Sequence, residues 1–325
     1  VTHLAGYGTA DRKNNTPMNP ESTLMRLGSV SKALTGVVAV AAAEQAIVRL
    51  HDDVRPLLAR GAIDADPGGP VTLHDFLTHT SGYSNRLLGQ RAESKEEWRG
   101  LSEFLSGNSL LALLEPGTAV IYSDLGMSLA GAVLEQAAGE PFPALAERLV
   151  FAPAGMVDTT FDPRLPPKLQ SELAQGYLWR GDSLTPVPYD YVMATPALGA
   201  VSTAADMGRL MALLLTGGGG MVDADSVALL MSRQETNYRG MRGRAYGFSE
   251  GNTAGRTAWF HDGMDPGFTA HISLVPELGL GVFVAANGAT TTGLGALSST
   301  GRLIHEFVGD LIRELWPAVS APVPE

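Results

Sequence analysis

The chain has 325 residues and a mass of 34.1 kDa, which is enough for one large domain or two ordinary ones. Hydrophobic residues make up 45% and charged residues 18%, so a sizeable core is available and wholesale disorder is excluded. The formal net charge is −11 with no Lys/Arg-rich run, which excludes a nucleic-acid partner. Cysteine is absent, so disulfides, thiolate nucleophiles and cysteine-ligated zinc are excluded as well.

The N-terminal third predicts a strand followed by helices. Residues 1–10 have short alternating apolar positions interrupted by glycines, a pattern typical of a strand and a turn. Residues 29–47 are rich in Ala, Leu and Val with few breakers, which predicts a largely buried helix. A second helix is expected over residues 71–77, where Thr72 and Asp75 have the spacing of a capping box.

The remaining elements predict helices followed by strands and a closing helix. Up to about residue 215 the chain is mostly helical with proline-rich connections. Residues 268–272 and 278–286 are two β-rich runs around Pro276-Glu277, which predicts a hairpin. An amphipathic helix over residues 302–316 follows, and we expect its apolar face to consist of Leu303, Phe307, Leu311 and Leu315.

This order predicts a sheet domain built from both ends of the chain, residues 1–62 and 216–325. A mostly helical domain, residues 63–215, is inserted into it, and the active site is expected at the interface of the two.

Neither a membrane span nor a leader is visible in the chain. The longest strongly apolar stretch, residues 34–43, is shorter than the ~20 residues that a spanning helix needs. The chain begins at Val1, which we interpret as a trimmed start, and this favours a periplasmic or secreted location over a cytoplasmic one. Residues 318–325 are expected to form a tail or a linker.

Ser29 and Lys32 carry the first chemical signal. They stand three residues apart at the start of a predicted helix, so their side chains share one face. The amides at the helix N-terminus stabilise negative charge near Ser29. Burial on an apolar helix lowers the pKa of a lysine, which predicts that Lys32 serves as a neutral base for the serine. Serine and lysine are both common, so a serine and a lysine three residues apart also occur by chance.

Two further segments add candidate groups. Tyr122 stands in the short polar break Tyr122-Ser-Asp124, where a phenol near a cation can relay protons. His261-Asp-Gly263 directly precedes the predicted hairpin, where a histidine can offer a polar atom and a glycine lets substrate approach the backbone. Each segment alone is equally compatible with a structural role.

Three other patterns are interpreted as structural. Residues 126–130 resemble a nucleophile elbow around Ser128 but lack its final glycine. His74 and His79 are five residues apart and do not share a helix face as zinc ligands would. The glycine run 217–220 lacks the Lys-Ser/Thr of a phosphate loop.

Taken together, Ser29-Val-Ser-Lys32, Tyr122-Ser-Asp124 and His261-Asp-Gly263 resemble the three motifs of the penicillin-recognising serine enzymes, in the same order. The similarity is greatest to the class C-like branch, which includes class C β-lactamases, D,D-carboxypeptidases, D-aminopeptidases and family VIII carboxylesterases. Residues 71–82, 116–117, 154–159 and 199–206 also look like family segments. The resemblance implies a β-lactamase-like α/β (α+β) sandwich, with an antiparallel sheet flanked by helices and an inserted all-helical domain.

The resemblance also implies roles for individual residues. Ser29 would be the acylated nucleophile, Lys32 its base or proton partner, and Tyr122 the second proton carrier. The backbone N–H groups of Ser29 and Met264 would form the oxyanion hole. His261 would orient the substrate or hold the electrostatics of the Lys32–Tyr122 pair. His79 would be a structural turn residue of the family, and neither a metal nor an organic cofactor is implied.

Two acidic residues depart from the family pattern and bear on substrate choice. Asp124 stands where the second motif usually ends in Asn, and Asp262 is the middle residue of the third motif. With Gly263, both are expected to line the substrate-binding cleft. Like charges at ~4 Å repel by ~4 kcal/mol at an effective dielectric of 20, so we expect a preference for neutral or cationic acyl compounds. Short p-nitrophenyl esters should then be better substrates than nitrocefin.

The sequence predicts a carboxylesterase-like serine hydrolase that forms an acyl-enzyme on a small-molecule ester, amide or β-lactam-like substrate. A D-amino-acid peptidase, a D,D-carboxypeptidase or a weak β-lactamase is the alternative. Acyl transfer, or a non-catalytic acyl-binding sensor that kept the fold, also stays open.

Overall fold

A four-stranded antiparallel sheet forms the centre of the computed structural model, in the order β12-β11-β10-β9. Its strands are β9 (Ser249–Thr253), β10 (Arg256–Asp265), β11 (Phe268–Val275) and β12 (Leu280–Ala286). The structure describes residues 1–63, 68–86, 88–107, 109–180, 182–237, 241–253, 255–289 and 299–315. The predicted tail 318–325 lies outside the described residues.

The helices have the following bounds: η1 (Gly28–Val30), α1 (Ser31–Glu44), η2 (Arg55–Leu57), α2 (Leu73–Thr78), α3 (Leu101–Ser106), α4 (Asp124–Ala138), α5 (Phe142–Ala146), the π-helical turn η3 (Glu147–Phe151), α6 (Ala152–Ala154), α7 (Pro167–Glu172), α8 (Thr195–Leu198), α9 (Ala204–Leu215), α10 (Ala224–Leu230), η4 (Pro276–Leu278) and α11 (Ser299–Leu315). The short strands are β1 (Thr9–Asp11), β2 (Thr16–Pro17), β3 (Met25–Arg26), β4 (Arg91–Ala92), β5 (Tyr177–Arg180), β6 (Ser183–Pro186), β7 (Tyr191–Val192), β8 (Val201–Ser202) and β13 (Gly288–Ala289).

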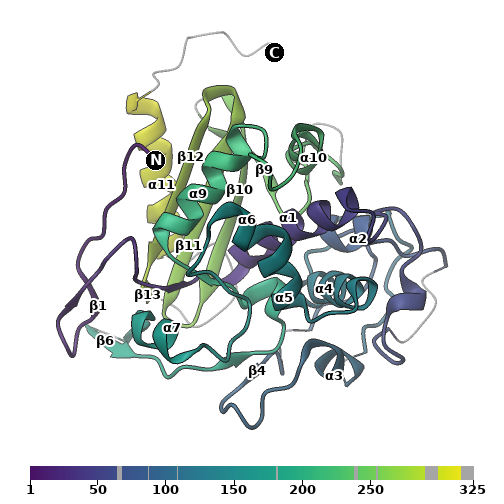
Figure 1. The fold of residues 1–325 in the computed structure, drawn as a ribbon, viewed down its shortest axis with the longest axis horizontal. Coiled ribbons are helices and arrows are strands. Elements are labelled where there is room, and N and C mark those ends of the chain that lie inside the picture. Colours follow the sequence, from purple (N-terminus) through teal and green to yellow (C-terminus); the bar gives the residue numbers. More distant parts are fainter. Residues whose placement is uncertain are drawn as a thin grey trace.

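Helices cover both faces of the sheet, as Figure 1 shows. On one face α1 and α9 pack against β10 and β12, while α11 packs on the other face through Ile304, Val308 and Ile312. α1 is apolar on every side because it lies between the sheet and the helices α4 and α8. Ser29, in the turn η1 that leads into α1, therefore lies where the sheet meets the helical part of the molecule.

Several predicted elements are confirmed. The hairpin forms as β11 and β12, and α2 has the full capping box, in which Thr72 and Asp75 bond each other's backbone N–H groups. The helix predicted over residues 29–47 forms as η1 and α1. The strand predicted for residues 1–10 is confined to Thr9–Asp11.

The apolar face predicted for the last helix is wrong: the buried residues each lie one position further along the chain than the predicted ones. Leu303 is 63% exposed and Phe307 is 56% exposed, whereas Ile304, Val308 and Ile312 are buried against the sheet. Both sets repeat every four residues, so spacing alone does not select between them.

The division into two domains remains a prediction, although the helix α9 bears on its boundary. α9 lies within residues 63–215, the predicted helical domain, yet it packs on β12. A Cβ on Gly281 of β12 would lie 3.0 Å from the Met211 side chain. This helix therefore belongs with the sheet. In the described residues we find no helix long and apolar enough to cross a membrane.

Candidate active site

Ser29 and Lys32 meet at the junction of η1 and α1. The Lys32 Nζ atom donates a hydrogen bond to Ser29 Oγ at 3.1 Å and another to the Ala197 carbonyl at 3.0 Å. Its third partner is the Asp124 carboxylate, at 2.7 Å. Lys32 is fully buried, whereas Ser29 is only half-buried. A fixed ammonium therefore holds a serine hydroxyl that can be reached from outside.

The charge of Lys32 differs from the sequence expectation. Burial acts to lower the pKa of this lysine, as expected, but the negative charge of Asp124, together with Tyr122, outweighs it. The pKa of Lys32 is therefore raised above its ordinary value. The prediction of a neutral amine is wrong for the enzyme without substrate, because the spacing of Ser29 and Lys32 gives no sign that Asp124 lies beside them.

Tyr122 lies beside Lys32 and is held in place by His79. The Lys32 ammonium is 4.8 Å from the centroid of the Tyr122 ring. The residues on either side of Tyr122 both bond to His79: the Ile121 N–H donates to its carbonyl at 2.7 Å, and the Ser123 N–H donates to its Nδ1 at 3.2 Å. The His79 and Tyr122 rings are in contact, with centroids 4.5 Å apart. His79 ends α2 in a left-handed conformation, which confirms its interpretation as a turn residue.

His261 lies on β10 with one ring nitrogen unused. Its Nδ1 is 2.7 Å from the Asp262 carbonyl oxygen, which can only accept, so Nδ1 carries the proton. Burial, reinforced by the charge of Lys32, lowers the pKa of His261 to about 3, so the ring is neutral at ordinary pH. Its Nε2 is buried without a hydrogen-bond partner among the described residues. This atom is therefore an acceptor available to a substrate donor, and the Tyr122 ring lies 6.3 Å away.

Two glycines let η1 and β10 come into close contact. A Cβ on Gly263 would lie 2.0 Å from the Leu27 carbonyl oxygen, and one on Gly28 would lie 2.4 Å from the Met264 carbonyl oxygen. Gly28 also has φ +52°, which L side chains rarely adopt. The backbone around Ser29 thus runs directly beside Met264, an arrangement that an oxyanion hole shared by their N–H groups requires.

The structure does not bring Asp262 to the other site residues. Successive strand residues point to opposite faces, and Asp262 shares its face with Ala258, which packs against α11. Its carboxylate pairs with His271 at 2.8 Å. The expectation that Asp262 lines the cleft is therefore corrected: only His261 and Gly263 of this motif face η1 and α1.

The Asp124 side chain does reach the centre of the candidate site, but its negative charge is paired with the positive charge of Lys32. The repulsion of anionic substrates expected from Asp124 and Asp262 therefore loses its basis, since one carboxylate is neutralised by an ion pair and the other lies on the far face. The geometry gives Asp124 a role in holding Lys32.

Sequence reasoning missed two residues of the site. Asn85 accepts a hydrogen bond from the Asp124 N–H at 3.1 Å and so helps to fix the start of α4. Arg244 places its guanidinium carbon 6.0 Å from the centroid of the Tyr122 ring. No motif contains either residue, because both reach the site only through the folding of distant segments. Ser128, by contrast, is fully buried and donates to the Asp124 carbonyl at 2.9 Å, as a structural serine does.

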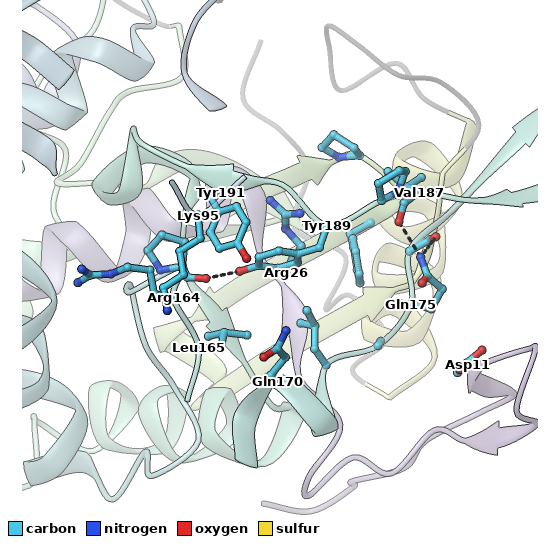
Figure 2. A pocket seen from close by; sticks show the side chains of 17 residues that line it. Asp11, Arg26, Lys95, Arg164, Leu165, Gln170, Gln175, Val187, Tyr189 and Tyr191 are labelled. Atoms are coloured by element: carbon cyan, nitrogen blue, oxygen red, sulfur yellow. Dashed lines mark hydrogen bonds between the residues drawn. The ribbon is translucent and has the colours of Figure 1, made fainter. Parts of the chain in front are cut away.

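A separate cavity of about 290 Å³ opens beyond the end of β10. Figure 2 shows Arg26 and Tyr189 in its wall, with the Tyr189 hydroxyl bonded to the Pro163 carbonyl. None of Ser29, Lys32, Tyr122 or His261 is among the described residues that line this cavity. Among the described residues, no cluster of three or more His, Asp or Glu side chains is arranged to hold a metal.

Curated relatives with named activities match this chain. It is 27% identical over 331 aligned positions to the D-alanyl-D-alanine-carboxypeptidase/endopeptidase AmpH of Escherichia coli K12, covering 95% of this chain and 80% of AmpH. It is 36% identical over 180 positions to esterase EstB of Burkholderia gladioli, covering 50% of this chain and 44% of EstB.

Solved structures share the fold. The penicillin-binding protein of Bacillus halodurans superimposes with a TM-score of 0.74 at 24% identity, covering 94% of this chain and 91% of that one. The D-amino acid amidase of Ochrobactrum anthropi SV3 gives a TM-score of 0.77 at 20% identity, covering 96% and 92%. The sequence model of the Beta-lactamase family matches residues 1–304. The chain therefore belongs to the Beta-lactamase family and is a serine hydrolase of the β-lactamase and penicillin-binding-protein type.

Proposed function

We propose that this protein hydrolyses small acyl compounds, with carboxylic esters as the first substrate class, through an acyl-enzyme on Ser29. The observation that carries the proposal is the 3.1 Å hydrogen bond from Lys32 Nζ to Ser29 Oγ, made by an ammonium that Asp124 holds in place. A hydroxyl fixed by a buried cation at the start of a helix is oriented for attack on a carbonyl carbon.

The protons move through the Lys32–Tyr122 pair. In the reacting state the pair holds one proton fewer than an ammonium and a phenol together, so it accepts the proton of Ser29 Oγ as that oxygen bonds to the acyl carbon. The pair then gives a proton to the departing oxygen as the ester bond breaks. Water then attacks the acyl-enzyme, gives its proton to the pair, and the pair returns a proton to Ser29 as the acid leaves. Because the two groups are coupled, their titration belongs to the pair.

The remaining site residues stabilise the oxyanion, orient the substrate and hold Lys32 and Tyr122 in place. The N–H groups of Ser29 and Met264 bind the oxyanion, and each such donor is typically worth about 3 kcal/mol. Gly263 lets η1 lie directly against β10 and so keeps the Ser29 and Met264 N–H groups close together, and His261 accepts a hydrogen bond through Nε2. His79 and Asp124 act as positioning residues for Tyr122 and Lys32.

A second candidate is a peptidase or amidase acting on D-amino acid derivatives. AmpH, which aligns with 95% of this chain, is named a D-alanyl-D-alanine-carboxypeptidase/endopeptidase. The acyl-enzyme step is the same for an ester and an amide, so release of D-alanine from a D-alanyl-D-alanine peptide distinguishes this activity. Acyl transfer is distinguished by adding an alcohol or amine and looking for its acylated product.

The proposal is tested by hydrolysis of short p-nitrophenyl esters, with nitrocefin in parallel. Ser29→Ala should lower kcat by several powers of ten, because the residual rate comes from binding and the oxyanion hole alone. Ser128→Ala is the matched control, since Ser128 lies in the elbow-like stretch and, among the described residues, makes only a side-chain hydrogen bond within its own helix. Full activity in Ser29→Ala, or loss in Ser128→Ala alone, would overturn the proposal; labelling of Ser29 without product release would identify a sensor.

A further inference from the structure

Two charged residues stand beside the two proposed donors of the oxyanion hole, and no step of the proposed function uses them. Asp265 directly follows Met264 at the end of β10, and Arg26 lies on β3, three residues before Ser29. The Arg26 Nε atom is 2.5 Å from Asp265 Oδ2, and the two side chains are only 6% and 0% exposed. One buried ion pair therefore connects the segment of one donor to the segment of the other.

Backbone hydrogen bonds do not make this connection. β3 pairs with β8, whereas β10 pairs with β9 and β11, so the two strands belong to different sheets. Among the described residues, no backbone hydrogen bond joins residues 25–30 to residues 261–265. Gly28 and Gly263 let η1 and β10 lie in contact, but a glycine permits a close approach without fixing its distance or direction. The Arg26–Asp265 ion pair adds the directional contact that the backbone does not supply.

A second ion pair holds the Arg26–Asp265 contact in place. Arg91 also pairs with Asp265, and Asp190 pairs with both arginines, at 2.5 Å from Arg26 Nη2 and 2.9 Å from Arg91 Nη1. The two positive and two negative charges cancel, so each buried charge is compensated inside the group. Arg91 is itself fixed by the backbone, because β4 pairs with β7 and places Arg91 opposite Val192.

The Arg26 side chain faces the cavity beyond the end of β10. Figure 2 shows it beside Tyr189, and its guanidinium carbon is 5.1 Å from the centroid of that ring. None of Ser29, Lys32 or Met264 is among the described residues that line this cavity. Arg26 therefore reaches the oxyanion hole only through the chain that it holds, and we assign it no contact with the reacting carbonyl.

We propose that Arg26 and Asp265 are positioning residues that set the separation of the Ser29 and Met264 N–H groups. The inference rests on the proposed function, which supplies the reaction whose oxyanion these groups bind. A donor stabilises the oxyanion only within hydrogen-bonding distance of it, so a small shift of η1 against β10 weakens the hole. Arginine suits this position because its planar fork contacts two carboxylates in fixed directions, whereas a lysine ammonium is a single point charge.

Arg26→Lys is the test variant, because it keeps the positive charge but loses the fork. With p-nitrophenyl acetate we expect kcat to fall by about 10- to 100-fold, the cost of displacing a catalytic group by up to about 1 Å. KM should change by less than about threefold, because the hole acts mainly on the transition state. A merely structural role would lower Tm and leave kcat unchanged at a temperature where the variant is fully folded.

Arg209→Lys is the matched control, since Arg209 also pairs with a buried carboxylate, that of Asp206, but lies on α9, which packs on β12. It should leave kcat unchanged. If Arg26→Lys does not fold, Arg91→Gln carries the same test at a side chain that is 25% exposed, with an expected fall in kcat of about 3- to 10-fold. Wild-type kcat in these folded variants would overturn the proposal.

A binding measurement separates this inference from the proposed function. Phenylboronic acid needs no turnover: its boron bonds to Ser29 Oγ, the serine proton passes to the Lys32–Tyr122 pair, and a boron-bound oxygen occupies the oxyanion hole. Calorimetric titration should show affinity about 10-fold or more weaker in Arg26→Lys and unchanged in Arg209→Lys. A fall in kcat without this loss of affinity would overturn the proposal, because Arg26 would then act elsewhere.

The two readouts together distinguish the two failures. If the wild-type chain hydrolyses no ester but the boronic acid binds more weakly to Arg26→Lys alone, the proposed function fails and the positioning role stands. If esters are hydrolysed and Arg26→Lys changes neither kcat nor this affinity, the positioning role fails and the proposed function stands. Absence of both hydrolysis and boronic acid binding in the wild-type chain would overturn both.

Discussion

Asp124 decides the charge of Lys32, the residue around which the site is built. Burial alone would favour the neutral amine, but the carboxylate at 2.7 Å, with Tyr122, keeps the ammonium. The ammonium in turn donates to Ser29. A lysine charged in this way orients the serine in the free enzyme, and it gives up its proton only within the coupled exchange with Tyr122.

Asp124→Asn should shift the pH dependence of the reaction. Loss of the carboxylate charge removes the attraction that raises the pKa of Lys32, so that pKa falls. The limb of the kcat/KM profile that reports the Lys32–Tyr122 pair should therefore move to lower pH. The profile is measured with a neutral ester on both proteins, and an unchanged profile would show that Asp124 does not control this charge.

Sequence patterns singled out Ser29, Lys32, Tyr122 and His261 because these residues stand in short motifs, and the structure brings the four close together. They did not predict which way the Asp262 side chain points. Successive residues of a strand point to opposite faces of the sheet. The direction of the Asp262 side chain therefore depends on the pairing register of β10 with β11. Arg244 stands in no motif, and only the folded chain brings it beside Tyr122.

The contact between η1 and β10 is the element-scale feature on which the site depends. Gly263 and Gly28 permit it, since any side chain at Gly263 would collide with the Leu27 carbonyl oxygen. Elements that approach this closely cannot accept an added methyl group without moving apart.

Gly263→Ala should therefore lower kcat/KM by about 100-fold or more, the cost of losing an oxyanion donor. The circular dichroism spectrum should stay that of the wild type. Gly100→Ala serves as the control, because the space around Gly100 is open and its φ is −61°. Wild-type kcat/KM in Gly263→Ala would mean that this contact does not set the active geometry.

Local patterns predicted the elements better than they predicted the packing between them. The capping box of α2 involves residues three apart and is visible in the sequence. The buried face of α11 depends on what the sheet presents to it: Ile304, Val308 and Ile312 fit against Val275 and Ala258, and the equally periodic Leu303 and Phe307 do not.

At the scale of the whole molecule, a buried ion network joins the sheet to segments that precede it in the chain. Asp265, at the end of β10, pairs with Arg26 at 2.5 Å and also with Arg91. Both arginines further pair with Asp190. Because the Asp265 side chain is fully buried, removing its charge leaves two arginines under-compensated.

Asp265→Asn should destabilise the protein by about 3–5 kcal/mol, the usual cost of breaking a buried ion pair. Asp162→Asn is the control, since the Asp162 and Arg164 side chains are 32% and 44% exposed and ion pairs at the surface contribute about 0–1 kcal/mol. Thermal unfolding of both variants gives the comparison. Equal shifts in Tm would contradict a structural role for the Arg26–Asp265 network.

The most direct measurement of the central claim is peptide mapping by mass spectrometry after reaction with a fluorophosphonate. The geometry around Lys32 predicts one adduct per chain, on the peptide that contains Ser29, and none in Ser29→Ala. An adduct on any other serine, or an unmodified Ser29 in a protein that still hydrolyses esters, would contradict the account.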